Sequence, residues 1–221
     1  MFRLLSWIIV LCALFVAINY RWTHAFVVYH LAAEECDARA MLVAERRVEG
    51  LFGAVTSQPR IGCLWQPSLG LGHNIGTTNF APGLAPVILL NSDGNRVDVI
   101  AHEWAHAELA ERLGFFDRNF VLPTWVDEGV AMQVDRRDSY NAHALSQLNK
   151  REDLERPHHG ALVGTGFFQA GDQGRYHYAW AKCAVAQWLD EETDWEMLAL
   201  SDWSRRDTVC LGDGAGGEPR R

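Results

Sequence analysis

The sequence predicts an α+β fold with a small mixed sheet and a helical C-terminal half. Apolar residues bounded by prolines and turn residues predict strands at 59–67 and, most clearly, at 86–91, where the chain reads PVILLN. Helical periodicity follows at 96–112, 124–137 and 176–191. The chain has 221 residues, of which 48% are hydrophobic and 22% charged, and is long enough to bury one sizeable core.

The segments around these elements carry further patterns that predict a helix, a hairpin and helix caps. Residues 25–52 carry apolar side chains at spacings of three and four, which predicts a stalk or the first helix of the domain. Glycines and prolines in residues 70–86 predict a loop and a hairpin. Gly114 is the expected C-cap of the helix at 96–112, and Thr124 is the expected N-cap of the next helix. We place the folded domain at 25–211 and a disordered tail at 212–221.

The N-terminal segment has a different composition from the rest. After Arg3, an uncharged run extends from Leu4 to Tyr20, close to the shortest span of a bilayer and the longest apolar region of a signal peptide. No small-residue cleavage site follows, and Tyr20 and Trp22 suit an interfacial position. We therefore predict that residues 1–24 are a single-pass anchor with the domain outside the cytosol. A cleaved secretory signal and a buried N-terminal helix are the alternatives.

Charge and cysteine content narrow the possible functions. A net charge of -8, without a run of Lys or Arg, argues against general nucleic-acid binding. Cys12 lies within the apolar run, which leaves an even set that allows three disulfide connectivities, as expected of an exported domain. This set consists of Cys36, Cys63, Cys183 and Cys210. No CxxC occurs, so a cysteine zinc site is not predicted, and buried free thiols are the alternative.

Residues 102–106 read HEWAH. On a helix, His102, Glu103 and His106 fall within an arc of about 100°. Two imidazoles one turn apart can bind a single zinc ion, and the carboxylate beside them can reach a water molecule on the metal. This arrangement suits metal-assisted hydrolysis, with Glu103 as the group that takes the proton from water. The alternative is that the two histidines pack or cap within a core.

A second motif, PTWVDEGVAM at residues 123–132, places Glu128 in the first turn of the following helix. A zinc site that keeps a position open for water needs three protein ligands, and this motif offers the third. Trp125, Glu128 and Gly129 form a W-x-x-E-G pattern. Together with HEWAH, this pattern resembles the gluzincin metallopeptidases over roughly residues 86–190.

The resemblance implies a zincin-like α+β fold with an active-site helix that carries HExxH and a second helix that carries the glutamate. It implies that His102, His106 and Glu128 bind one zinc ion and that Glu103 is the general base. The metzincin class is excluded, because Leu109 stands where its pattern has glycine and no third histidine follows.

Several other residues near the motifs have candidate roles. Asp127 competes with Glu128 as a carboxylate and could instead orient a histidine, although helix dipoles alone favour acids at this position. Gluzincins commonly place a tyrosine or histidine against the oxyanion. In RYHYAWAKCAVAQWL we favour Tyr178 as this catalytic donor, with Tyr176 and His177 as alternatives.

Residues 86–91 resemble the gluzincin edge strand that lines the cleft. Such a strand can pair with an extended peptide, but an ordinary core strand is the alternative. Gluzincin aminopeptidases carry a G-A-M-E-N-type segment before the histidine helix. The corresponding TTNFAPGLAPVILL lacks it, so aminopeptidase activity is not predicted.

The sequence therefore predicts a membrane-anchored zinc peptidase that acts on peptide or protein substrates. A zincin-like domain with a binding or assembly role and little or no hydrolysis is the second hypothesis, and a structural membrane protein without metal is the third. The intact Glu103 favours the enzyme, because a domain that only binds zinc needs no base at this position.

Overall fold

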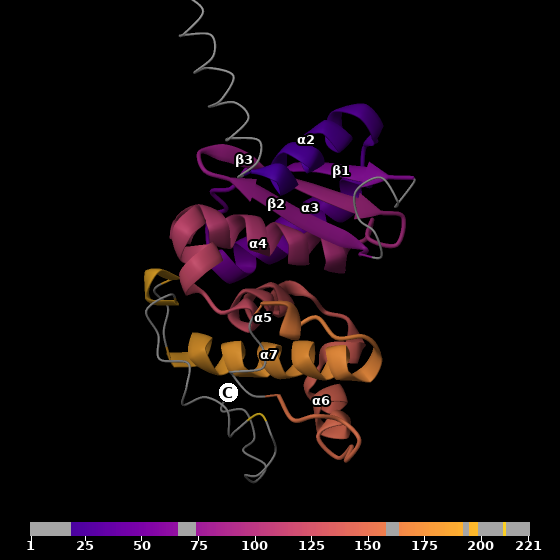
Figure 1. The fold of residues 1–221 in the computed structure, drawn as a ribbon, viewed down its shortest axis with the longest axis vertical. Helices are drawn as coiled ribbons and strands as arrows, with labels where there is room; N and C mark the ends of the chain where they lie inside the picture. The colour runs from indigo at the N-terminus through magenta and orange to yellow at the C-terminus, as the bar shows by residue number, and fades with distance from the viewer. Residues whose placement is uncertain (1–18, 66–73, 158–163, 192–194, 199–209, 211–221) are drawn as a thin grey trace, which may run out of the picture. The chain divides into compact units, whose positions relative to one another are not determined.

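A computed structural model gives the fold of the chain (Figure 1). It describes residues 19–65, 74–157, 164–191, 195–198 and 210. The chain divides into two compact units, residues 1–111 and 112–221. The described part has one small mixed sheet and is otherwise mostly helical, which confirms the α+β class.

The first unit contains a three-stranded sheet and helices on its faces. Its elements are α2 (Tyr20–Ala32), α3 (Ala38–Phe52), β1 (Arg60–Leu64), β2 (Gly76–Ala81), β3 (Leu84–Asn91) and the greater part of α4 (Val97–Phe116). The strand order is β1-β3-β2, with β1 parallel and β2 antiparallel to β3. Gly83, at φ 70°, forms the tight turn of the predicted hairpin between β2 and β3.

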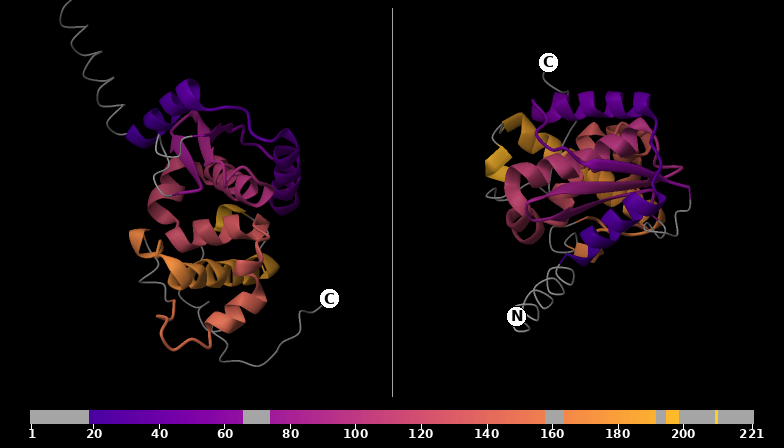
Figure 2. Two further views of the ribbon diagram at one scale, coloured as in Figure 1. Left: turned by 90° about the vertical axis from the view of Figure 1, so that its right-hand side faces the viewer. Right: turned by 90° about the horizontal axis from the view of Figure 1, so that it is seen from above.

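Strand β3 is the central strand of this sheet, so the prediction that residues 86–91 form its edge is wrong. Val87 and Leu89 pack against α2, while Leu90, on the opposite face, lies near Glu103 of α4. Figures 1 and 2 show α2 and α4 on opposite faces of the sheet. A strand covered on both faces is apolar at every position, which explains the unbroken PVILL. Strand β2 lies at an edge instead.

The helical pattern of residues 25–52 belongs to two helices rather than one. Helix α2 ends at Ala32, and α3 begins at Ala38 after Asp37, whose carboxylate caps the new helix by accepting hydrogen bonds from Arg39 N and Ala40 N. Apolar residues keep their spacing through the break, so periodicity alone does not reveal it.

Helix α2 packs against the sheet of the first unit. Trp22 Nε1 donates a hydrogen bond to Ala85 O at 3.0 Å, and its ring stacks on Phe26. Within the described residues, every helix is too short or too polar to cross a bilayer. This finding contradicts the predicted single-pass anchor. Residues 1–18, most of the predicted segment, and the predicted disordered tail lie outside the described residues.

The second unit is helical. Its elements are the π-helix η2 (Asp117–Val121), α5 (Thr124–Val134), η3 (Asp138–Tyr140), α6 (Ala142–Leu148), η4 (Gly164–Gly166), α7 (Gly171–Glu191) and η5 (Trp195–Leu198). Helix α5 starts at Thr124, as the sequence indicates, but Thr124 is not its N-cap. The cap position is Pro123, and Thr124 Oγ1 instead accepts a hydrogen bond from Gly164 N at 2.8 Å.

Helices α5 and α7 form the core of this unit. The rings of Trp125 and Trp180 lie 4.9 Å apart at their centroids. A Cβ atom on Gly129 would lie 2.6 Å from both Ala181 O and Val185 Cγ2. The glycine of the W-x-x-E-G pattern therefore permits the close approach of the two helices.

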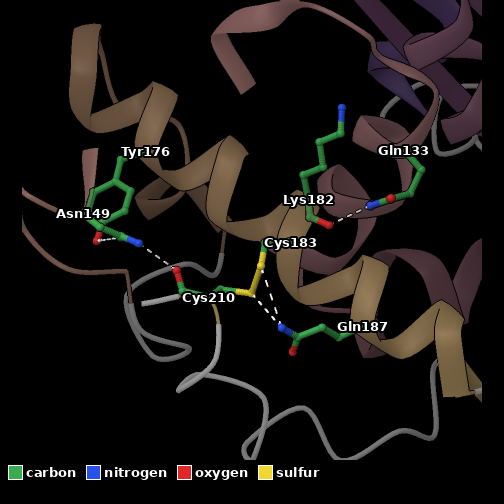
Figure 3. The surroundings of a disulfide bond; sticks show 7 residues. All are labelled: Gln133, Asn149, Tyr176, Lys182, Cys183, Gln187 and Cys210. Atoms are coloured by element: carbon green, nitrogen blue, oxygen red, sulfur yellow. Dashed lines mark hydrogen bonds between the residues drawn. A yellow bond between two sulfur atoms is a disulfide. The ribbon is translucent and has the colours of Figure 1, made fainter. Parts of the chain in front are cut away.

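Two disulfides join residues within the units, one in each. Cys36 pairs with Cys63 in the first unit, and Cys183 pairs with Cys210 in the second. These pairs select one of the three connectivities that the sequence allows. Figure 3 shows the second bond, where Asn149 Nδ2 also donates a hydrogen bond to Cys210 O at 3.0 Å. The disulfide and this hydrogen bond fix Cys210 beside α6 and α7.

Candidate metal centre

The HEWAH motif lies in the buried part of α4. Every residue from Val99 to Leu109 is buried, and the side chains of His102 and His106 are 7% and 5% exposed. Histidines on a solvated helix face would be far more accessible. Burial of two polar rings in an apolar surround requires partners for their nitrogens.

The geometry of the two rings suits a shared metal ion. His102 Nε2 and His106 Nε2 lie 3.2 Å apart, with the ring planes at 82°. Two imidazole nitrogens bonded at 2.0–2.1 Å to one tetrahedral ion are about 3.3 Å apart. The two nitrogens therefore have the spacing expected of two ligands of the same metal ion.

Glu128, in the first half of α5, is the third member of the group. Its side chain is buried, at 8% exposure. One ligand atom from each of His102, His106 and Glu128 lies within 4.8 Å of the other two. The three residues could therefore hold a metal ion, as their sequence motifs predict, and a tetrahedral ion would keep its fourth position for water.

Asp127, the competing carboxylate, has a different partner. Arg118 Nη2 donates to Asp127 Oδ2 at 2.6 Å, and the two side chains are only 11% and 13% exposed. This ion pair ties η2 to the first turn of α5, one residue before Glu128. Asp127 is therefore held by Arg118, and Glu128 is the carboxylate in the group that could hold a metal ion.

The carboxylate of Glu103 contacts the edge strand β2. Thr78 Oγ1 lies 2.6 Å from Glu103 Oε2 and 2.9 Å from the backbone oxygen of Glu103. Gly76, two residues earlier, lies against the other carboxylate oxygen, because a Cβ atom there would be 2.9 Å from Glu103 Oε1. Neither contact could be inferred from the sequence, because both depend on the packing of β2 against α4.

The three candidates for the oxyanion donor have different surroundings on α7. The hydroxyl of Tyr176 donates to Asn149 Oδ1 at 2.6 Å, as Figure 3 shows. His177 is buried, with Nδ1 2.9 Å from Phe167 O. Tyr178 is partly exposed and packs its ring against Phe167. The assignment of Tyr178 as a catalytic residue stays a prediction.

Sequence reasoning did not single out Glu108, although it is fully buried in α4. Its carboxylate accepts hydrogen bonds from Thr56 N, Thr56 Oγ1 and Ser57 N. Burial raises the pKa of this carboxyl, but the hydrogen bonds from Ser57 and Thr56 outweigh burial and hold the pKa below its ordinary value. The available signal is that its immediate neighbours, Ala107, Leu109 and Ala110, are all apolar.

The second unit also contains a cavity of about 620 Å³ beside the Cys183–Cys210 disulfide. Residues of α6 and α7 contribute to its lining, which includes Lys150, Lys182 and Asp190. None of the candidate metal ligands or candidate catalytic residues lies in this lining.

Comparison of the chain with protein-family models, with curated proteins and with solved structures finds no match. The interpretation of the site therefore depends on its own residues and their geometry.

Proposed function

We propose that the chain is a zinc-dependent peptidase of gluzincin type that hydrolyses peptide bonds in peptide or protein substrates. The observation that carries the proposal is the grouping of His102, His106 and Glu128, with Glu103 next to the first ligand on the same helix. A site of two histidines and one glutamate with an open fourth position is a ligand set of hydrolytic zinc centres. When bound, zinc supplies a Lewis acid that lowers the pKa of a water molecule and polarises the substrate carbonyl.

In this proposal, side chains of the protein bind the metal, transfer the proton and stabilise the oxyanion. His102, His106 and Glu128 hold the ion. Glu103 accepts a proton from the attacking water and later returns it to the leaving amine. Tyr178 donates a hydrogen bond to the oxygen that gains negative charge, with Tyr176 and His177 as the alternatives.

The fold supports this proposal in general terms. A zincin-like arrangement has a small mixed sheet next to the helix that carries HExxH, followed by a second helix with the glutamate. Here β2, not β3, is the edge strand that contacts this helix. The segment before α4 contains no glutamate of the G-A-M-E-N type, so we propose an activity other than aminopeptidase.

Metal analysis and turnover of a mixed peptide library test the proposal together. We expect about one zinc ion per chain, cleavage by the native protein, and loss of cleavage with zinc retained in Glu103→Gln. The control is Glu111→Gln, which makes the same change at an exposed position of the same helix and should cleave normally.

The two measurements also separate this proposal from the alternatives. Bound zinc without cleavage of any library peptide would support a domain that binds or assembles without hydrolysis. A native protein that binds no zinc under conditions where it is folded would exclude both ideas.

A further inference from the structure

The geometry around Glu103 points to Thr78 as a positioning residue for the proposed general base. We infer that the Thr78 hydroxyl holds Glu103 Oε2, so that Oε1 is the atom that takes the proton from water. This inference depends on the proposed function, because it assigns a role to each oxygen of the base.

Strand β2 presents two residues to Glu103. Gly76 and Thr78 are two positions apart, so they lie on the same face of the strand. They pair with Leu90 and Ile88 of β3, which fixes their register along the sheet. Thr78 contacts Glu103 Oε2, and a side chain at position 76 would meet Glu103 Oε1.

The contact from Thr78 is a short hydrogen bond. A hydroxyl has one proton, so Thr78 donates to one acceptor at a time. Its distance of 2.6 Å to Glu103 Oε2 is typical of a hydroxyl that donates to a carboxylate, while the backbone oxygen of Glu103 is farther away, at 2.9 Å. The carboxylate is therefore the favoured acceptor, and one of its two oxygens is engaged by the protein.

The other oxygen is kept clear by the absence of a side chain. A Cβ atom at position 76 would lie 2.9 Å from Glu103 Oε1 and 3.0 Å from both Glu103 Cγ and Leu90 Cδ2. Such distances are too short for a methyl group, so alanine would force the carboxylate to move. Glycine at this position lets β2 approach Glu103 without displacing Oε1.

The hydrogen bond from Thr78 and the space beside Gly76 give the carboxylate one fixed and one reactive oxygen. In the hydrolytic step an O–H bond of the water breaks, its proton bonds to Oε1, and the remaining oxygen attacks the carbonyl carbon. Thr78 keeps its own proton throughout. It acts by holding the plane and rotamer of Glu103, which matters because a small misplacement of a reacting group lowers the rate severely.

Three variants of strand β2 test the inference. Thr78→Val removes the hydroxyl and keeps the shape, and Thr78→Ser keeps the hydroxyl. Thr77→Val is the matched control, because the side chain of Thr77 lies on the opposite face of the strand. Zinc content is measured for each, kcat and KM are measured with a quenched fluorescent peptide that the native protein cleaves, and crystal structures locate Glu103.

For Thr78→Val we expect kcat to fall by about 10- to 100-fold, the range for loss of a hydrogen bond to a charged group. KM and zinc content should stay close to native values. Thr78→Ser should recover kcat to within about threefold, and Thr77→Val should behave as native. In the crystal structure of Thr78→Val, the Glu103 carboxylate should leave its native position.

Equal loss in Thr78→Val and Thr78→Ser would overturn the inference, as would an unmoved Glu103 with native kcat in Thr78→Val. A native protein that cleaves no peptide would defeat the proposed function instead. The position of Glu103 in crystal structures of the native protein and of Thr78→Val would then still decide whether Thr78 holds it.

Discussion

His102 Nε2 and His106 Nε2 lie 3.2 Å apart within the buried part of α4. This separation matches two ligands of one tetrahedral ion, so a bound metal would join two successive turns of the helix. A ligand that binds only the folded protein raises its stability, by about 2.7 kcal/mol when the free ligand is at 100 times its Kd. A bound metal should therefore stabilise the protein.

We expect removal of metal with a chelator to lower the melting temperature of the native protein and re-addition of zinc to restore it. His106→Ala should bind less than a tenth of the native zinc, and a chelator should leave its melting temperature unchanged. His143→Ala, at an exposed position of α6, is the control and should respond like the native protein. Zinc content and thermal unfolding followed by circular dichroism measure these effects. A chelator effect that survives in His106→Ala would contradict the prediction.

The sequence was sufficient to single out the three residues that could hold a metal ion, because their signals are local. The i, i+4 spacing places His102 and His106 on one face of any helix, and W-x-x-E-G sets Glu128 within its own turn. The arrangement of the strands was harder to predict. The apolar run at 86–91 indicates a strand, but its edge position rests only on the resemblance. A run in which apolar and polar residues do not alternate is typical of a strand that is buried on both faces.

Other features depend on contacts between segments that are distant in sequence. The contact between Thr78 and Glu103 requires the register of β2 on β3, and the bonds from Thr56 to Glu108 require the loop after α3 to meet α4. Neither has a periodic signal. The break between α2 and α3 is hidden by a periodic signal that continues across it, because Ala40 and other apolar residues keep the helical spacing.

Neighbouring carboxylates on α5 allow a matched comparison. Glu128→Gln should lose zinc, because a neutral amide is a much weaker ligand than a carboxylate. Asp127→Asn should keep zinc but lose stability by about 3 kcal/mol, since it removes the negative charge from a largely buried ion pair with Arg118. Zinc content and urea unfolding of both variants measure these outcomes. If Asp127→Asn loses zinc while Glu128→Gln retains it, the assignment of the ligand is reversed.

Gly129 should be intolerant of any side chain. Gly129→Ala places a Cβ atom 2.6 Å from Ala181 O and from Val185 Cγ2, so α5 and α7 must separate. Overpacking of this kind costs about 1–3 kcal/mol, and we expect a lower free energy of unfolding in urea.

The control for Gly129 is Gly50→Ala in α3, where an added Cβ meets nothing within 4 Å. This change should raise stability by about 0.5–1 kcal/mol, because alanine is the better helix former. Equal effects of the two substitutions would show that helix propensity, and not the contact with α7, governs position 129.

Glu108 should make stability depend on acid pH. Its folded-state pKa is held below the ordinary 4.5 by hydrogen bonds from Ser57 and Thr56 that outweigh burial. The unfolded chain therefore takes up this proton at a higher pH than the folded protein does. The stabilisation is fully present above pH 4.5 and is lost as the pH falls through the folded-state pKa, with a slope of at most about 1.4 kcal/mol per pH unit.

Urea unfolding of the native protein and of Glu108→Gln between pH 7 and pH 3 measures this effect. At pH 7 the variant should be less stable by about 1–3 kcal/mol, because the amide cannot accept all the hydrogen bonds that the carboxylate accepts. Below pH 4.5 its stability should fall less steeply than that of the native protein, so the two curves converge. Glu111→Gln, exposed on the same helix, should keep the native slope. Parallel curves for the native protein and Glu108→Gln would mean that another carboxylate controls the acid sensitivity.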